Sequence, residues 1–243
     1  MKKTLLSGLA LLCLLIFCSS FLGTRKPIKI LLAGDSTVKS YDTAQTEMRG
    51  WGQYLQTHFN DNVEVINHSE GGRSSGSFLR EGRWDRLLKQ VSPGDYVLIQ
   101  FGHNDTSTKP ERHVDPEQFT ANLIRFSNDV RARKGTAILV TPIAMREFEN
   151  GQLVAKRPHF AEYAQRMRDA AHAADIKLID LNRMTSEWIQ ELGDSASIEL
   201  YYWVGAKKDN THLREKGAQA YAAFVAKSIQ EQRIRPLYRY LKR

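Results

Sequence analysis

The sequence contains five short, mostly apolar runs that are separated by longer segments with a helical period. The runs span Ile28–Ala33, Val63–Ile66, Tyr96–Phe101, Ala137–Thr141 and Lys177–Leu181. Nearly continuous runs of this kind are typical of strands buried on both faces, as in a parallel sheet covered by helices. The pattern therefore predicts an α/β protein, a three-layer α/β/α sandwich built on a parallel five-stranded sheet.

Three of the intervening segments carry an apolar stripe at helical spacing. The first opens with Asp115 and Pro116, an N-cap followed by a first-turn proline, and Gly135 is a suitable stop. The stripes consist of Phe119, Leu123, Phe126 and Val130, of Tyr163, Met167, Ala170 and Ala174, and of Ala218, Tyr221, Val225 and Ile229. We interpret all three as core-facing surfaces of helices.

The first twenty residues have the composition of a secretory signal. Lys2 and Lys3 precede an apolar run from Leu5 to Cys18, and two serines follow. The run is shorter than the roughly 20 apolar residues that a membrane span requires. We therefore expect residues 1–20 to be a signal peptide.

Export is expected to deliver the protein to the periplasm or the extracellular space. An uncleaved anchor is an alternative, because Phe21 and Leu22 prolong the apolar stretch, and a lipoprotein modified at Cys18 is another. Both cysteines of the chain lie within the signal, so cleavage leaves no thiol in the mature protein. Residues 21–243 show no repeat or long linker and are expected to form a single domain.

The composition excludes several classes of protein. Of the 243 residues, 42% are hydrophobic and 26% are charged, which excludes a disordered chain and a polytopic membrane protein. Loss of the signal lowers the formal net charge from +8 to +6, which suits an anionic partner and equally a solvated basic surface. No phosphate loop, dinucleotide-binding glycine pattern or metal-ligand spacing is present. We expect a monomer with no metal, cofactor or nucleic-acid partner.

Polar clusters stand where the predicted strands end, and in such sheets chemistry takes place at the carboxyl ends of the strands. The clusters are Gly34–Thr37, Asn67–Ser75, Gly102–Asp105 and, before the last helix, Asp209–His212. Each of them alone is compatible with a turn, a helix cap or a buried histidine. Together they supply a nucleophile, hydrogen-bond donors and an acid–base pair.

The chemistry that these clusters favour is ester hydrolysis. Ser36 is the candidate nucleophile, His212 the base that takes its proton, and Asp209 the acceptor that fixes the imidazole tautomer. Asp209 precedes His212 by three residues, so one turn of chain would bring their side chains together. The backbone N–H groups of Ser36 and Gly72 and the side-chain amide of Asn104 are the candidate oxyanion-hole donors.

Other residues could take the place of the acid–base pair. The competing bases are His103, His113, His159 and His172, and the competing carboxylates are Asp35 and Asp105. His159 and His172 bracket a helical stripe and His113 lies in a charged loop, so we prefer His212.

These residues resemble the SGNH (GDSL-type) hydrolase superfamily, and within it the rhamnogalacturonan acetylesterase branch. The segments that carry the resemblance are Gly34–Thr37, Gly71–Ser74, Phe101–Asp105 and Asp209–Leu213. The resemblance implies a flavodoxin-like α/β/α fold, a serine–histidine–aspartate hydrolase, and the same three oxyanion donors. It also implies that the substrate is an acetyl ester on plant cell-wall pectin, especially rhamnogalacturonan.

Two features depart from the resemblance or lie outside it. Thr37 stands where many members of the superfamily carry leucine, and Leu200–Lys208 matches no motif.

Arg73, Arg146 and Trp203 are expected to border the strand ends, where they could bind a carboxylate or stack on a sugar. A surface salt bridge and a core aromatic are equally compatible with these residues.

The function that the sequence favours is a secreted serine esterase that deacetylates pectic polysaccharide. One alternative is an esterase of the same fold for another acyl substrate: a lysophospholipase, a thioesterase, or a xylan or peptidoglycan O-acetylesterase. Another is a glycan-binding module without activity, which the presence of Ser36, Asp209 and His212 disfavours.

Overall fold

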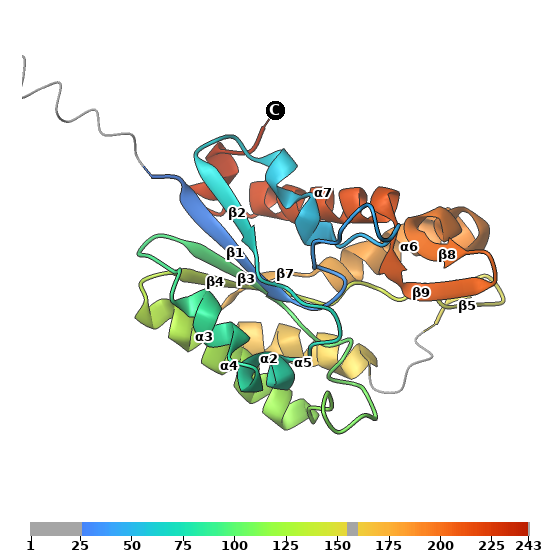
Figure 1. The fold of residues 1–243 in the computed structure, drawn as a ribbon, viewed down its shortest axis with the longest axis horizontal. Helices are drawn as coiled ribbons and strands as arrows, with labels where there is room; N and C mark the ends of the chain where they lie inside the picture. The colour runs from blue at the N-terminus through green and yellow to red at the C-terminus, as the bar shows by residue number, and fades with distance from the viewer. Residues whose placement is uncertain (1–25, 155–159, 243) are drawn as a thin grey trace, which may run out of the picture.

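A five-stranded, fully parallel sheet forms the centre of the protein (Figure 1). The computed structural model describes residues 26–154 and 160–242. The strand order is β2-β1-β3-β4-β7, with bounds β1 (Ile28–Gly34), β2 (Val63–Asn67), β3 (Tyr96–Gln100), β4 (Thr136–Val140) and β7 (Lys177–Ile179). The predicted α/β fold class is confirmed, and the predicted strands differ from these only at their ends. The last strand stops at Ile179 because Leu181 already opens the next helix.

Helices cover both faces of the sheet (Figure 1). One layer contains α2 (Ser75–Arg80), α3 (Arg83–Leu88), α4 (Pro116–Ala132) and α5 (Phe160–Ala173). The other contains α6 (Leu181–Ser197), α7 (Glu215–Glu231) and the short 3-10 helices η1 (Trp51–Gln53), η2 (Leu55–His58), η3 (Ile198–Leu200) and η4 (Leu237–Arg239). The sheet thus separates two layers, as a three-layer sandwich requires.

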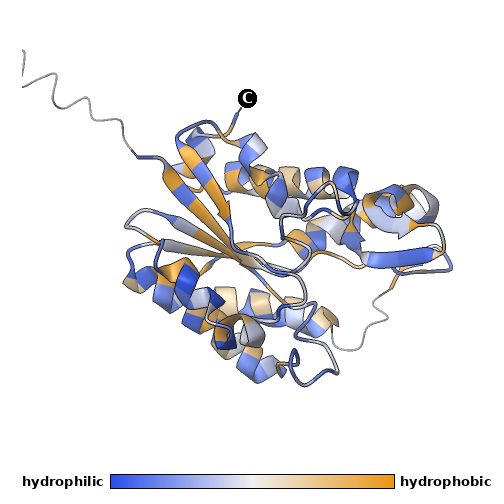
Figure 2. Ribbon diagram, in the orientation of Figure 1, coloured by the Kyte–Doolittle hydropathy of each residue, from blue (hydrophilic) through white to orange (hydrophobic). Residues whose placement is uncertain are grey.

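Each layer packs against its own hydrophobic cluster. Successive residues of a strand point to opposite faces, so Ile30 and Leu32 of β1 join the cluster under α6 and α7, whereas Leu31 and Ala33 join the one under α2–α5. The strands are accordingly apolar along most of their length, and the helices are apolar mainly on their inner sides (Figure 2). The three predicted stripes lie in these clusters, except that Ala174 is only partly buried.

The sequence identified the start of α4 correctly. Asp115 is the N-cap, its side chain accepts a hydrogen bond from the backbone N–H of Gln118 at 2.8 Å, and Pro116 occupies the first helical position. A proline there removes no helical hydrogen bond, since the first N–H groups of a helix have no partner within it.

Two small hairpins were not predicted. They are β5 (Phe148–Glu149) with β6 (Gln152–Leu153), and β8 (Tyr201–Val204) with β9 (Lys207–Leu213). The segment Leu200–Lys208, which matched no motif, therefore forms most of the second hairpin. This hairpin lies beyond the central sheet, next to α6 (Figure 1).

The predictions for the N-terminus concern residues that lie outside the ranges described by the structure. The signal peptide over residues 1–20, with Cys13 and Cys18, falls there. Within the described ranges, no helix has the length and apolar character needed to cross a membrane.

Helix α7 approaches η3 so closely that only a glycine fits between them. A Cβ at Gly217 would lie 2.3 Å from the carbonyl oxygen of Leu200, which accepts a hydrogen bond from the backbone N–H of Arg214. We expect Gly217→Ala to lower the free energy of unfolding by about 1–3 kcal/mol, because overpacking outweighs the better helix propensity of alanine. Urea unfolding of the variant measures this.

The matched control for this prediction is Gln219→Ala, an exposed position of the same helix. It should change the free energy of unfolding by no more than about 0.5 kcal/mol. Equal stability of Gly217→Ala and the wild type would contradict the close approach.

Candidate active site

Ser36 stands in a tight turn directly after β1. A Cβ at Gly34 would lie 2.7 Å from Cγ2 of Val38, so the chain can fold back here only with glycine. The carbonyl oxygen of Asp35 accepts hydrogen bonds from the N–H groups of Val38 and Lys39 at 3.2 and 3.0 Å, which closes the turn. Ser36 is only 9% exposed, yet its side chain faces the cavity described below.

A buried chain of hydrogen bonds fixes this turn against the sheet. Trp51 Nε1 donates to Gln100 Oε1 at 2.9 Å, and Gln100 Nε2 donates to Thr37 Oγ1 at 2.6 Å. The Thr37 hydroxyl in turn donates to Asp35 Oδ1 at 2.8 Å, and the Thr37 N–H reaches the same oxygen at 2.9 Å. A leucine at Thr37 could neither accept from Gln100 nor donate to Asp35. This gives a structural reason for threonine at the position where the sequence departs from many superfamily members.

The structure brings Ser36, His212 and Asp209 together in a row. Ser36 Oγ lies 2.9 Å from His212 Nε2, and His212 Nδ1 lies 2.8 Å from Asp209 Oδ2. Because the carboxylate is an acceptor, Nδ1 carries the proton of the neutral ring, and Nε2 is left to accept from the serine hydroxyl.

Asp209 and His212 both lie in strand β9, at a bulge that brings their side chains together. The prediction that a single turn of chain before the last helix would do so is therefore wrong. In the β8–β9 hairpin, Tyr201 pairs with Leu213 and Trp203 with Lys208, so β9 has more residues than β8 between these pairs. Extra residues in one strand of a pair are displaced out of the ladder. This displacement lets the two side chains, which are three positions apart, point the same way.

Hydrogen bonds within the hairpin, and one from the segment after β4, stabilise the bulge. Asp209 Oδ1 accepts from the N–H groups of Thr211 and His212 at 3.0 and 2.9 Å. Arg146 N–H donates to the carbonyl of Asn210 at 2.8 Å, and Trp203 Nε1 donates to Asn210 Oδ1 at 3.0 Å. The hairpin is therefore fixed to the segment that follows β4.

These hydrogen bonds also determine the charge of the carboxylate. Burial alone would raise the pKa of Asp209, but hydrogen bonds from the His212 ring and backbone, and from Thr211, outweigh it and lower the pKa to about 2. Asp209 is accordingly ionised at neutral pH and available as an acceptor for the imidazole.

Gly72 and Asn104 lie at the same cavity as Ser36. Gly72 has a φ of 77°, a left-handed conformation that favours glycine, and Asn104 Nδ2 donates to the carbonyl of Arg73 at 3.2 Å. The cavity has a volume of about 450 Å³, and it is lined by Ser36, Tyr41, Met48, Gly71, Gly72, His103, Asn104, Arg112, Lys207, Asp209, Thr211 and His212.

Sequence reasoning missed four of the lining residues: Tyr41, Met48, Arg112 and Lys207. They come from loops and from a hairpin rather than from the motifs at the strand ends, so no local signal marks them. Tyr41 has a clear structural role, since its hydroxyl donates to the carbonyl of Ser36 at 2.9 Å.

The competing histidines have other surroundings. His103 lines the cavity, but the residue is only 4% exposed and its ring stacks on Phe160 with a centroid distance of 4.7 Å. His113 is exposed and contacts the carbonyl of Ser107, and His172 is exposed near the end of α5. His159 lies outside the described residues.

The competing carboxylates accept hydrogen bonds from backbone N–H groups and not from the His212 imidazole. Asp105 is fully buried and accepts hydrogen bonds from the N–H and hydroxyl of Ser75 and from the N–H of Gly102, at 2.9, 2.6 and 3.0 Å. It thereby joins the segment after β3 to the start of α2. Asp35 likewise accepts a hydrogen bond from the backbone N–H of Thr37 and so stabilises the turn around Ser36.

Of the residues considered for substrate binding, Arg146 is internal and Trp203 packs against it. Arg146 is buried, forms an ion pair with Asp194, donates to Ser197 Oγ at 3.0 Å, and has the Trp203 ring 4.4 Å from its guanidinium carbon. Arg73 forms a 3.0 Å ion pair with Glu81 at the surface. None of the three candidates, Arg73, Arg146 and Trp203, lines the cavity.

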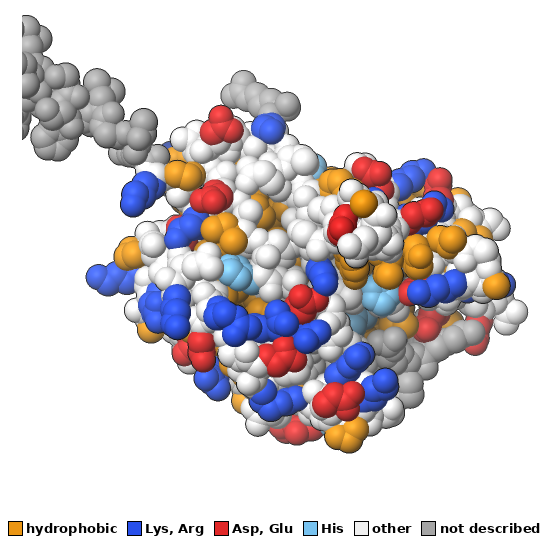
Figure 3. Space-filling view, in the orientation of Figure 1, with side chains coloured by type: hydrophobic (Ala, Val, Ile, Leu, Met, Phe, Trp, Pro, Cys, Tyr) orange, Lys and Arg blue, Asp and Glu red, His pale blue; other side chains and the backbone are white. Residues whose placement is uncertain are grey.

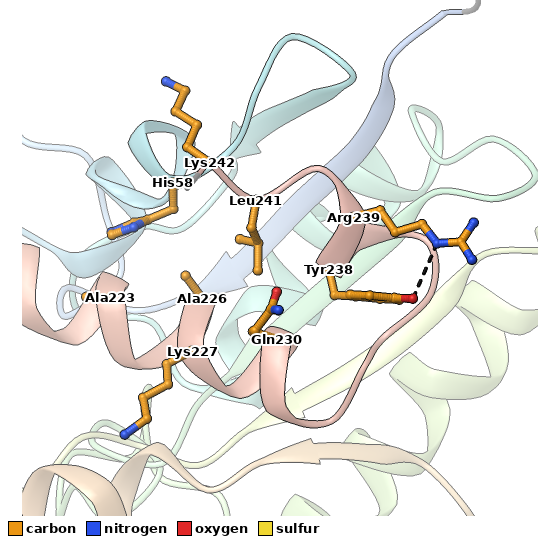
Figure 4. Close-up of a pocket in the computed structure, with 9 residues that line it drawn as sticks. All are labelled: His58, Ala223, Ala226, Lys227, Gln230, Tyr238, Arg239, Leu241 and Lys242. Carbon is orange, nitrogen blue, oxygen red and sulfur yellow. Dashed lines mark hydrogen bonds between the residues drawn. The ribbon is translucent and has the colours of Figure 1, made fainter.

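A second hollow of about 630 Å³ lies between α7, η2 and the C-terminal segment (Figure 4). Its lining is basic and aromatic, with Tyr238 accepting a 3.3 Å hydrogen bond from Arg239, and it contains no serine, cysteine or carboxylate. It therefore lacks a serine or cysteine nucleophile and a carboxylate that could orient a histidine base. In the described part of the chain, no group of His, Cys, Asp and Glu has the arrangement of a metal site.

Comparison with known proteins identifies the family of the chain. Residues 32–220 match the GDSL-like Lipase/Acylhydrolase family, and the chain belongs to this family. It is a carboxylic ester hydrolase.

The more similar relatives are bacterial. The chain is 36% identical to "Probable rhamnogalacturonan acetylesterase YesY" of Bacillus subtilis, over 83% of this chain and 92% of that protein. It is also 36% identical to rhamnogalacturonan acetylesterase RhgT of the same organism, over 85% of this chain and 91% of the relative. The crystal structure of B. subtilis YxiM superposes with a TM-score of 0.76 at 27% identity, covering 86% of this chain and 58% of YxiM.

Thr37 gives a test of the buried hydrogen-bond chain. Thr37→Val keeps the shape but removes the hydroxyl, which leaves the buried Gln100 amide without its acceptor. We expect a loss of about 1–3 kcal/mol in the free energy of unfolding, measured by urea denaturation. Thr37→Ser, which keeps the hydroxyl, is the control and should lose less. A larger loss for the serine variant would contradict the role of the hydroxyl.

Asp105 and Asp209 should affect the free energy of unfolding at different pH and with opposite sign. Burial raises the pKa of Asp105 from its ordinary 3.8 to about 7, although hydrogen bonds from Ser75 and Gly102 oppose the shift. A raised native pKa means that the folded state binds the proton more tightly. Wild type should therefore lose stability relative to Asp105→Asn as the pH rises from about 4 to about 7. Denaturant unfolding across this range measures the difference.

Asp209→Asn is the control for this titration. Because the native pKa of Asp209 is lowered to about 2, its stabilisation is present above its ordinary pKa of 3.8 and is lost as the pH falls toward 2. The difference between wild type and Asp209→Asn should thus stay flat between pH 4 and 7. An equally flat difference between wild type and Asp105→Asn would show that the raised pKa of Asp105 has been assigned wrongly.

Proposed function

We propose that this protein removes acetyl groups from acetylated pectic polysaccharide of the rhamnogalacturonan type, with Ser36, His212 and Asp209 as the catalytic residues. The observation that carries the proposal is the row of two hydrogen bonds, 2.9 and 2.8 Å long, from Ser36 Oγ through the His212 ring to Asp209. This is the arrangement in which an imidazole activates a serine.

The first half of the reaction forms an acetyl-enzyme. Ser36 Oγ attacks the carbonyl carbon of the acetyl ester while its proton moves to His212 Nε2. The resulting imidazolium is stabilised by the ionised Asp209 on the other side of the ring. The tetrahedral intermediate then collapses, the bond to the sugar oxygen breaks, and His212 returns the proton to that oxygen.

The negative charge of the tetrahedral intermediate needs donors that are already in place. The backbone N–H groups of Ser36 and Gly72 and the Nδ2 of Asn104 are assigned to this role, because all three residues line the cavity around the serine. Loss of one such donor typically costs about 2.7–4 kcal/mol in the activation barrier. No metal or cofactor is required by this sequence of steps.

The second half returns the enzyme to its initial state. Water loses a proton to His212 Nε2 and attacks the acetyl carbonyl, and the intermediate again forms against the same donors. When the bond to Ser36 Oγ breaks, His212 supplies the proton, and acetate and free serine result.

The choice of a pectic substrate is supported by two further observations. Relatives that are 36% identical over most of their length are named as rhamnogalacturonan acetylesterases. The formal charge of residues 21–243 is +6, which favours a polyanionic polymer. Export through residues 1–20 is part of the proposal, since such a polymer lies outside the cell that degrades it.

Acetate release from three polymers tests the proposed function. We expect the wild type to deacetylate acetylated rhamnogalacturonan faster than acetylated xylan or O-acetylated peptidoglycan, and p-nitrophenyl acetate faster than the octanoate ester. Ser36→Ala should lower every one of these rates by about 10⁴-fold or more with the fold intact. Preference for xylan, peptidoglycan or the long acyl chain would replace the proposed substrate.

Variants of the other two residues test the roles within the mechanism. His212→Ala removes the base, whereas Asp209→Asn removes only the group that orients the ring and stabilises the imidazolium. Asp209→Asn should therefore retain more activity on p-nitrophenyl acetate than His212→Ala. The reverse order would show that the base has been assigned wrongly.

A further inference from the structure

Arg112 lies over the glycine that is assigned to the oxyanion hole. It belongs to the loop between β3 and α4, and its backbone N–H donates to the carbonyl of Lys109 at 2.9 Å. Its Cζ and Nη2 both lie 3.4 Å from the position that a Cβ of Gly72 would occupy. Arg112 is half-buried and forms part of the cavity wall that also contains Ser36.

Several arginines and lysines around this end of the sheet are neutralised by acidic side chains. Lys39 pairs with Glu70 at 2.6 Å, and Arg73 and Arg83 pair with Glu81 at 3.0 and 2.6 Å. Lys and Arg side chains are interspersed with Asp and Glu over α2 and α3 in the same way (Figure 3).

Arg112 differs from these cations. Among the residues that the structure describes, no acidic side chain pairs with it and no group accepts a hydrogen bond from its guanidinium. Lys207, on the β8–β9 hairpin, also lines the cavity, but it is exposed and its Nζ lies 4.9 Å from the centroid of the Tyr202 ring. Arg112 is thus the unpaired, half-buried cation of the described cavity wall.

A half-buried guanidinium with all its donors available is suited to a planar anion. It presents N–H groups in a fixed fork that matches the two oxygens of a carboxylate, and such bidentate pairs are stronger than neutral hydrogen bonds. The partly dehydrated position strengthens this attraction relative to that of an exposed lysine. A neutral sugar offers no group of this geometry.

We propose that Arg112 forms a carboxylate subsite beside the reacting ester and selects substrates in which a uronic acid carries or adjoins the acetyl group. This inference rests on the proposed function, since it requires an acetylated sugar at Ser36. It makes Arg112 a specificity-determining residue, distinct from the residues that perform the acyl transfer.

The subsite is tested with two substrates that differ only in charge. One is an O-acetylated methyl galacturonoside, and the other is the same compound with its carboxylate replaced by a carboxamide. Acetate release gives kcat/KM for each, and their ratio measures selection of the carboxylate independently of the acyl chemistry. In the wild type, this ratio should be about tenfold or more and should fall as the salt concentration rises.

Arg112→Gln removes the charge and should bring the ratio close to one. Arg112→Lys keeps a point charge without the fork and should give an intermediate ratio. Arg131→Gln is the matched control, because Arg131 is exposed on α4 and its replacement changes the net charge equally. The control should keep the wild-type ratio.

The outcomes separate the subsite from the proposed function. Equal rates of the wild type on the acid and the amide, for the monosaccharide and for the oligomers described below, would overturn the subsite and leave pectic deacetylation in place. An unchanged ratio in Arg112→Gln would do the same, and parallel loss on both substrates would assign Arg112 to the oxyanion instead. Release of acetate from none of the monosaccharides and oligomers, with p-nitrophenyl acetate still hydrolysed, would overturn the proposed substrate and the subsite together.

The same measurement on acetylated di- and trigalacturonides locates the carboxylate. If it belongs to the acetylated sugar, the monosaccharide pair already shows the full ratio. If it belongs to a neighbouring sugar, the ratio appears only when the adjacent residue of the oligomer carries a carboxylate. Either result supports the subsite, whereas a ratio near one in every pair contradicts it.

Discussion

The hydrogen bond between Ser36 and His212 joins residues that are 176 positions apart, and the site depends on it. It spans 2.9 Å between atoms that belong to two separate parts of the fold, the turn after β1 and the bulge in β9. Neither part can create the contact alone. The distance is fixed only because both are held against a common framework, the carboxyl end of the parallel sheet.

Each side of this contact has its own buried support. On the serine side, hydrogen bonds from Trp51 through Gln100 to Thr37 stabilise the turn from within the core. On the histidine side, the fully buried Tyr201 of β8 donates to the carbonyl of Ala144 at 2.8 Å, which anchors the hairpin to the segment after β4. The low pKa of Asp209 follows from the same geometry, because the bulge directs two backbone N–H groups at its carboxylate. Stability and the orientation of the imidazole thus depend on the same hydrogen bonds.

The sequence was sufficient to predict the sheet and to select candidate residues that the structure brings together at one cavity, because both leave local signals. Buried strands are apolar runs, the start of α4 is marked by Asp115 and Pro116, and the polar clusters mark the strand ends. The bulge in β9 has no local signal, since a spacing of three between Asp209 and His212 fits a helical turn equally well. The same is true of Arg112, whose position over Gly72 results from the packing of a loop. Such features depend on contacts between distant segments, which periodicity cannot reveal.

The central claim is that the Ser36 hydroxyl becomes acetylated during turnover. The direct measurement is acid quenching of the enzyme in the first turnovers with an activated acetyl ester, followed by peptide mass spectrometry. The account predicts one acetyl group on the peptide that contains Ser36, and greater accumulation in a variant with weakened deacylation. An acetyl group on another residue, or product formation with no acetyl-enzyme under any quench condition, would contradict it.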